Sequence, residues 1–188
     1  MKKYLSLLAV AVLFTGCEAS STSTGDSNLT EGGTNAAMSK NLSALTQKIN
    51  SESTRLMTML EKSNPDMKDD LKEAMEAFKK GDMEGALDEF KGVYQGHLTP
   101  EQMEVAKDLA SHMQVFALES EFKTTEGPVG KAIDAIRAQD PQLAMTSLQD
   151  LIQKGGLSSD QKDVVSEIMK YYAGSVDAAK DSLKGFGF

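Results

Sequence analysis

The sequence predicts an all-α domain of about seven helices, and three observations support this prediction. Apolar residues recur at three- and four-residue steps from residue 38 onward, which is the spacing of one face of a helix. Helix-start signals with proline at the first helical position occur at Pro65 and Pro100. A stretch of helices then recurs once along the chain. We place the helical domain at 38–184.

The first 16 residues have the organisation of an export signal. Two lysines precede an apolar run over residues 5–14, which is too short to span a bilayer as a helix. Small residues at positions 15 and 16 then lead to Cys17. This pattern resembles the bacterial lipoprotein signal, although Phe14 stands where that signal usually has leucine. The resemblance implies a signal peptide at 1–16, cleavage before Cys17 and a lipid on its sulfur. An ordinary secretory signal that contains a cysteine is the alternative.

The cysteine usage agrees with lipidation. Cys17 is the only cysteine in the chain, so the exported domain uses no disulfide. A lipid would cap this thiol, and more than one acyl chain anchors a protein stably in a membrane. Glu18 is not the aspartate that commonly retains such lipoproteins at an inner membrane. We therefore expect a lipid-anchored protein of the cell envelope, at the outer membrane facing the periplasm if the cell has two membranes.

The net charge argues against a nucleic-acid partner. The chain has 20 Lys and Arg against 28 Asp and Glu, and the predicted signal removes two lysines and no acid, which leaves a formal charge of −10. A field of that sign repels nucleic acid and anionic lipid from the folded part. Tryptophan is absent, which weakens the case for an aromatic carbohydrate site.

Residues 17–37 are predicted to form a disordered tether between the lipid and the domain. This segment is rich in Ser, Thr, Gly and Asn and has Leu29 as its only large apolar residue. It cannot bury enough surface to offset its ordering entropy. A coil of about 20 residues would hold the domain roughly 25 Å from the membrane. Residues 185–188 are expected to be a flexible tail.

The first half of the domain is predicted to contain four helices. An apolar stripe marks a helix near 40–62, and Asn64 caps a second helix that ends at Gly81. Asp82 caps a third helix that stops at Gly96. The sequence Thr99-Pro100-Glu101-Gln102 is a capping box that begins a fourth helix. The polar segment 119–127 is expected to end that helix.

The remaining helices repeat this pattern at an offset of 58 to 59 residues. The units cover about 72–113 and 130–172, and they match in apolar face, turn and capping residues, which indicates a true internal repeat. The capping box at Thr99 and Gln102 recurs at Ser158 and Gln161. Matching positions include Ala74 with Ala132, Phe78 with Ile136, Asp82 with Asp140, Ala86 with Ala144, and Phe90 with Leu148.

The first unit resembles a tetratricopeptide repeat in its small, aromatic and turn positions, at Ala74, Phe78, Gly81, Ala86 and Phe90. The second unit keeps the pattern but has Gln139 where the turn glycine would be. The resemblance implies a right-handed solenoid fragment of helical hairpins with one face left for binding. The family repeats at nearer 34 residues, so a generic hairpin duplicated within a helical bundle is the alternative.

No catalytic, cofactor or metal motif is present. His97 falls in a loop, and His112 is expected at the edge of the core or exposed. The eleven methionines are interpreted as core packing rather than as a copper site. The acidic residues Asp69, Asp70, Glu119, Glu121 and Glu126 lack the pattern of a calcium loop and are interpreted as solvated surface. We therefore assign no catalytic residue, cofactor or metal, and expect that the protein is not an enzyme.

The architecture favours a protein-interaction module or scaffold that presents a groove to a protein or peptide partner in the envelope. The alternative from a different class is a helical bundle that binds a small ligand or a metal in an interior pocket. The two differ in whether the inner faces leave an open groove or enclose a pocket.

Overall fold

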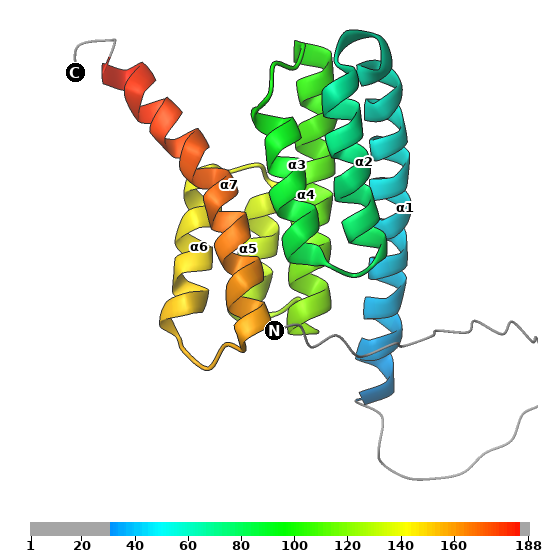
Figure 1. Cartoon of the computed structure of the whole chain (residues 1–188). Helices are drawn as coiled ribbons and strands as arrows, with labels where there is room; N and C mark the ends of the chain where they lie inside the picture. The colour runs from blue at the N-terminus through cyan, green and yellow to red at the C-terminus, as the bar shows by residue number, and fades with distance from the viewer. Residues whose placement is uncertain (1–30, 185–188) are drawn as a thin grey trace, which may run out of the picture.

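The computed structural model describes the backbone of residues 31–184 and the side chains of residues 37–173. This range contains seven helices and no strand (Figure 1), which confirms the predicted all-α class. The signal, Cys17 and the tail at 185–188 lie outside the described residues. The helices are α1 (Glu31–Ser63), α2 (Pro65–Lys79), α3 (Met83–Gln95), α4 (Pro100–Phe122), α5 (Gly127–Arg137), α6 (Pro141–Gln153) and α7 (Ser159–Lys184).

Helix α1 begins earlier than the sequence predicts. It is already helical at Glu31, so its first two turns fall within the segment 17–37 predicted as tether. This part contains two glycines and no large apolar residue, and it would not form a helix alone. It extends the amphipathic stretch that follows, because adding a residue to an existing helix needs no new nucleus. Residues 17–30 lie outside the described part of the chain.

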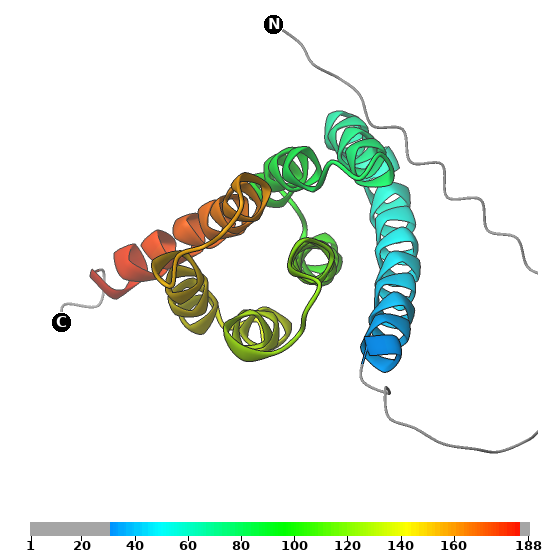
Figure 2. The ribbon, with the colours of Figure 1, turned by 90° about the horizontal axis from the view of Figure 1, so that it is seen from below.

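The helices form two four-membered rings that share α4. In the first ring, α1 contacts α2, α2 contacts α3, α3 contacts α4, and α4 closes the ring against α1. In the second ring, α4, α5, α6 and α7 contact one another in the same order. Figure 2, along the helix axes, shows α4 between α1 and the arc of α5, α6 and α7. Contacts between α3 and α7 join the rings further.

Helix α4 is therefore the central helix of the domain. From Met113 to Glu119 only Phe116 keeps partial exposure, so this stretch is buried on nearly all sides. Two sequence expectations are wrong here. The helix continues to Phe122 rather than ending at residue 119. Glu119 is fully buried rather than solvated, because helices pack on both sides of α4.

The two capping boxes are present and each ties its helix to an earlier one. Thr99 and Gln102 bond each other's backbone at the start of α4, and Ser158 and Gln161 do the same at α7. The Nε2 of Gln102 also donates to the Met59 carbonyl of α1 at 3.1 Å. The Nε2 of Gln161 donates to a carbonyl near the end of α4, at 3.2 Å. The repeating element is thus a set of three helices.

The other caps agree with the prediction except at α2. The side chain of Asp82 accepts from the amide of Gly85, and that of Asp140 accepts from the amide of Leu143. Asn64 occupies the N-cap of α2, but its side chain makes no capping bond. Its Nδ2 instead donates to the His97 carbonyl at 3.1 Å, so it fixes the loop between α3 and α4.

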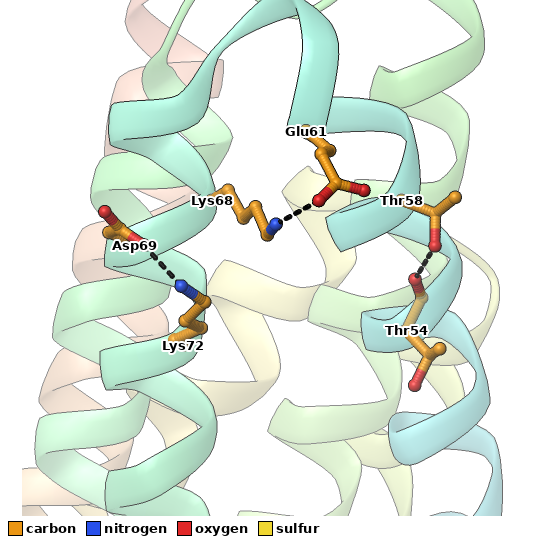
Figure 3. Close-up of polar contacts among 6 residues, drawn as sticks. All are labelled: Thr54, Thr58, Glu61, Lys68, Asp69 and Lys72. Atoms are coloured by element: carbon orange, nitrogen blue, oxygen red, sulfur yellow. Dashed lines mark hydrogen bonds and ion pairs between the residues drawn. The ribbon is translucent and has the colours of Figure 1, made fainter.

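Two ion pairs lie on the surface of α1 and α2 (Figure 3). The ammonium of Lys68 lies 2.9 Å from the Glu61 carboxylate and that of Lys72 lies 2.6 Å from Asp69. Hydrogen bonds from these lysines lower the pKa of both carboxyl groups. The pairs are solvent-exposed, so they add little to stability. The expected solvated position of Asp69 is confirmed.

Small residues allow the two helices of each helical hairpin, α2–α3 and α5–α6, to pack closely. Ala86 on α3 and Ala144 on α6 are fully buried at equivalent positions. Replacing either with leucine is expected to overpack the contact and lower the free energy of unfolding by about 1–3 kcal/mol. Leucine at the exposed Ala37 of α1 serves as the control. Chemical denaturation measures all three variants, and core substitutions as silent as the control would contradict this packing.

Candidate functional site

Two adjoining hollows lie on the two sides of the middle of α4. We call the first the tyrosine pocket, a space of about 230 Å³ among α3 to α7. The second, the α1 groove, has about 410 Å³ and lies between α1 and the facing parts of α4 and α5. Ser111 of α4 and Gln139 of the α5–α6 turn line both. The hollows therefore form one candidate site with two compartments.

Gln139 adopts a backbone conformation that normally favours glycine. Its φ is +52°, while the equivalent turn of the first unit has Gly81 at φ +78°. A left-handed conformation costs a residue with a Cβ about 1–2 kcal/mol. The side chain compensates in part, because its Nε2 donates to Asp108 of α4 at 3.1 Å. Strain that is kept where a side chain lines two hollows points to a functional position.

Three tyrosines form one wall of the tyrosine pocket. The ring centroids of Tyr94 and Tyr171 lie 4.4 Å apart, and those of Tyr171 and Tyr172 lie 5.6 Å apart. The Tyr172 hydroxyl donates to Oε1 of the buried Gln114 at 2.8 Å. The Tyr171 hydroxyl is buried beside Tyr94 and makes no hydrogen bond of normal geometry. Burial raises the pKa of both phenols above the ordinary value of 10.0, so both hydroxyls remain able to donate.

The α1 groove has a mixed polar lining. Nδ1 of His112 lies 2.8 Å from the Glu52 carboxylate, and each of these side chains is 22% exposed. The expected position of His112 at the edge of the core is confirmed. Lys48 of α1 and Asp108 of α4 contribute opposite charges to the lining. His97 lies exposed in its loop, as expected, and is not part of the groove.

An ion pair with one fully buried partner lies at the α1 groove. Arg137, which lines the groove, places its guanidinium 2.9 Å from the carboxylate of Glu119. Glu119 is fully buried, while the side chain of Arg137 is 48% exposed. Burial raises the pKa of Glu119 above its usual value, and the nearby Arg137 opposes that rise. The pair fixes the end of α5, where the strained turn begins.

Ser111 is the hydroxyl-bearing residue that lines both compartments. The Ser111 hydroxyl donates to the Ile136 carbonyl at 3.3 Å and not to the neighbouring His112, so it is not held as an activated nucleophile. Over the described side chains, no cluster of three or more His, Cys, Asp or Glu residues is arranged to hold a metal ion. Across residues 31–184, no helix has the length and apolar content of a membrane span.

Comparison with known protein families, curated proteins and solved structures finds no match to this chain. The sequence shows Gln139 where the turn glycine would be, but it assigns this residue no role. The departure from an otherwise well-matched repeat is the feature by which the position could have been found. The tyrosines gave no such signal, because Tyr94 and Tyr171 also fit the apolar stripes of their helices.

Exchanging the two turn residues tests the strain. Gln139→Gly is expected to raise the free energy of unfolding by about 1 kcal/mol, because glycine adopts positive φ without a Cβ clash. Gly81→Gln is expected to lower it by a similar amount in the first unit. Chemical denaturation of both variants measures the effect. A Gln139→Gly protein less stable than the parent would show that the left-handed turn stores no strain.

Proposed function

We propose that this chain is a lipid-anchored protein of the cell envelope that binds a segment of another protein in the α1 groove. The observation that carries the proposal is Gln139, a strained residue kept at the rim of a groove that is open to solvent. The first unit has Gly81 at the equivalent turn, so the fold itself does not require a glutamine there. Proteins commonly give up local stability where binding needs a particular side chain.

The groove has the surface character of a protein-binding site. Leu45 and Ala44 of α1 supply apolar contact, while Asn41, Lys48 and Asp108 supply donors, acceptors and charges of both signs. Such a mixed lining is typical of interfaces that form and dissociate, which resemble the rest of a protein surface in polarity. The balance of charges favours a partner segment that is itself polar rather than strongly charged.

We further propose that the α2–α3 and α5–α6 hairpins are tetratricopeptide-like. The matching aspartate caps, the left-handed turn residues and the buried alanines Ala86 and Ala144 support this relation. Helix α4 stands between the hairpins, which do not contact each other within the described residues. A solenoid of this type would therefore repeat three helices per unit.

Site-specific photo-crosslinking in intact cells tests the groove. A photoreactive residue at Ala44, exposed on the groove wall, is expected to give one discrete adduct of higher mass. The control carries the same residue at Glu73, which is exposed on α2 away from the groove. Equal adducts at both positions, or none at Ala44, would contradict the proposal.

Anchoring through Cys17 is tested separately. Cys17→Ser removes the sulfur that the lipid would occupy, so the variant should remain unprocessed or appear in the soluble fraction. Metabolic labelling with a radioactive fatty acid, followed by membrane fractionation, gives the answer. Incorporation of as much label into Cys17→Ser as into the parent would contradict the lipoprotein proposal. Fractionation of the parent protein also tests the outer-membrane location.

The tyrosine pocket favours a second function, the binding of a small molecule. It is lined by residues of α3, α4, α5, α6 and α7, and three of them are tyrosines. Pockets of this kind, mostly apolar with a few polar groups, are typical of ligand sites. The chemistry of the lining indicates which ligand would fit.

A further inference from the structure

The tyrosine pocket differs from its counterpart in the first unit. A hollow also lies at the α2–α3 turn, where Phe78, Gly81 and Met83 stand at the positions equivalent to Ile136, Gln139 and Pro141. No tyrosine lines that hollow. The duplicated fold therefore accounts for a hollow at this turn, but not for the polar groups of the tyrosine pocket.

Two buried polar atoms near this pocket make no hydrogen bond of normal geometry. They are the hydroxyl of Tyr171 and Nε2 of Gln114, whose residues are 7% and 1% exposed. A buried polar group without a hydrogen bond is unfavourable, and the Tyr171 side chain lines the pocket. The hydroxyl itself is buried behind the pocket surface, so a ligand in the pocket would meet the Tyr171 ring rather than its hydroxyl. An aromatic ring of the ligand would meet the tyrosine rings edge-on or offset, as aromatic pairs prefer.

The charge at the pocket indicates an anion. Lys107 is exposed and is the single charged residue in the lining. The domain as a whole carries a formal charge of −10 after removal of the predicted signal, so the attraction of Lys107 for an anion is confined to the pocket itself. A lone cation at the mouth of an apolar pocket favours a ligand with one carboxylate.

The volume limits the ligand to one ring with small substituents. The pocket encloses about 230 Å³, whereas an apolar cavity of about 150 Å³ accepts benzene. The additional space accommodates a carboxylate and one further polar group.

We propose that the tyrosine pocket binds a small monocyclic aromatic carboxylate, with its ring against the tyrosine wall and its carboxylate toward Lys107. This goes beyond the binding of a protein segment in the α1 groove. Because Ser111 and Gln139 line both compartments, a bound acid would lie directly beside the groove.

Nuclear magnetic resonance of the purified chain with ¹³C-labelled tyrosine rings tests the proposal. The chain has four tyrosines and no tryptophan, and three of the four line the pocket. Titration with 4-hydroxybenzoate is expected to shift the Tyr171 and Tyr172 signals saturably. Two probes separate the features of the ligand, since 4-hydroxybenzamide lacks the charge and cyclohexanecarboxylate lacks the aromatic ring. Both are expected to bind about tenfold more weakly or worse.

Two substitutions locate the site. Tyr94→Leu removes one ring of the tyrosine wall at a partly exposed position, so the variant should fold and bind 4-hydroxybenzoate about tenfold more weakly. Lys107→Gln should weaken 4-hydroxybenzoate similarly and leave 4-hydroxybenzamide unchanged. Lys79→Gln, at the first unit's hollow, is the matched control and should have no effect. The proposal would be overturned if no tyrosine signal shifted saturably at 4-hydroxybenzoate concentrations up to about 1 mM. It would also be overturned if all variants bound 4-hydroxybenzoate equally. Crosslinking at Ala44 would be unaffected by that failure.

Discussion

Replacing Leu109 with alanine is expected to lower the free energy of unfolding by about 4 kcal/mol. The side chain is fully buried on α4, the helix shared by both rings. Leucine-to-alanine substitutions in a core cost about 2–5 kcal/mol, because the cavity adds to the lost burial. We place Leu109 in the upper part of this range, since α4 is enclosed on both sides and has little freedom to collapse into the space. Chemical denaturation measures the loss.

Leu148→Ala provides the matched control. Leu148 is also fully buried, but it lies on α6, which belongs to the second ring alone. Hydrogen exchange is expected to show faster opening in both rings for Leu109→Ala. For Leu148→Ala the faster exchange should be confined mainly to α5, α6 and α7. Identical exchange patterns in the two variants would show that α4 does not couple the rings.

Replacing Arg137 with methionine is expected to cost about 3 kcal/mol at neutral pH. The substitution leaves the carboxylate of Glu119 fully buried and without its ion-pair partner. Breaking a buried pair in this way costs about 3–5 kcal/mol. The lower end of that range applies, because Arg137 is half-exposed and water can reach the space that it leaves. A loss below about 0.5 kcal/mol, typical of a surface pair, would contradict the buried pairing.

The loss should depend on pH in a defined direction. Burial raises the pKa of Glu119, and Arg137 is the group that lowers it, so Arg137→Met should raise that pKa further. Between the unfolded pKa of about 4.3 and the raised folded pKa, the folded state binds more protons than the unfolded state. Stability conferred on the variant by protonation is therefore present at low pH and lost as pH rises. The difference between variant and parent should shrink on acidification.

The double variant Glu119→Met/Arg137→Met is the control for this prediction. It removes both charges and replaces them with apolar side chains, which is often neutral or stabilising. Its free energy of unfolding should lie within about 1 kcal/mol of the parent, and the pH-dependent difference should disappear. Denaturation curves at about pH 5 and about pH 8 are sufficient. A double variant as unstable as Arg137→Met would assign the loss to packing.

Features encoded by neighbouring residues could be predicted from the sequence. The caps at Asp82 and Asp140 and both capping boxes involve residues three apart, and all are present. The repeat also matched Phe78 with Ile136 and Phe90 with Leu148, and all four side chains are buried. Such signals depend on neighbouring residues, so they do not change with the helices that pack against them.

Features that depend on packing between distant helices could not be predicted. Val115 and Leu118 are buried on α4, because helices of both rings pack against it. The same packing buries Glu119, whose partner Arg137 is 18 residues away. The tyrosine pocket joins Tyr94 to Tyr171 and Tyr172 across five helices, which no spacing in the sequence indicates.

The central claim is that Gln139 keeps its strained backbone because its side chain serves binding. The most direct measurement combines the free energy of unfolding of Gln139→Gly with the yield of the Ala44 crosslink in the same variant. We expect a protein that is more stable by about 1 kcal/mol and gives markedly less adduct than the parent. A variant of higher stability with an undiminished adduct would contradict the account, since Gln139 would then have no part in binding.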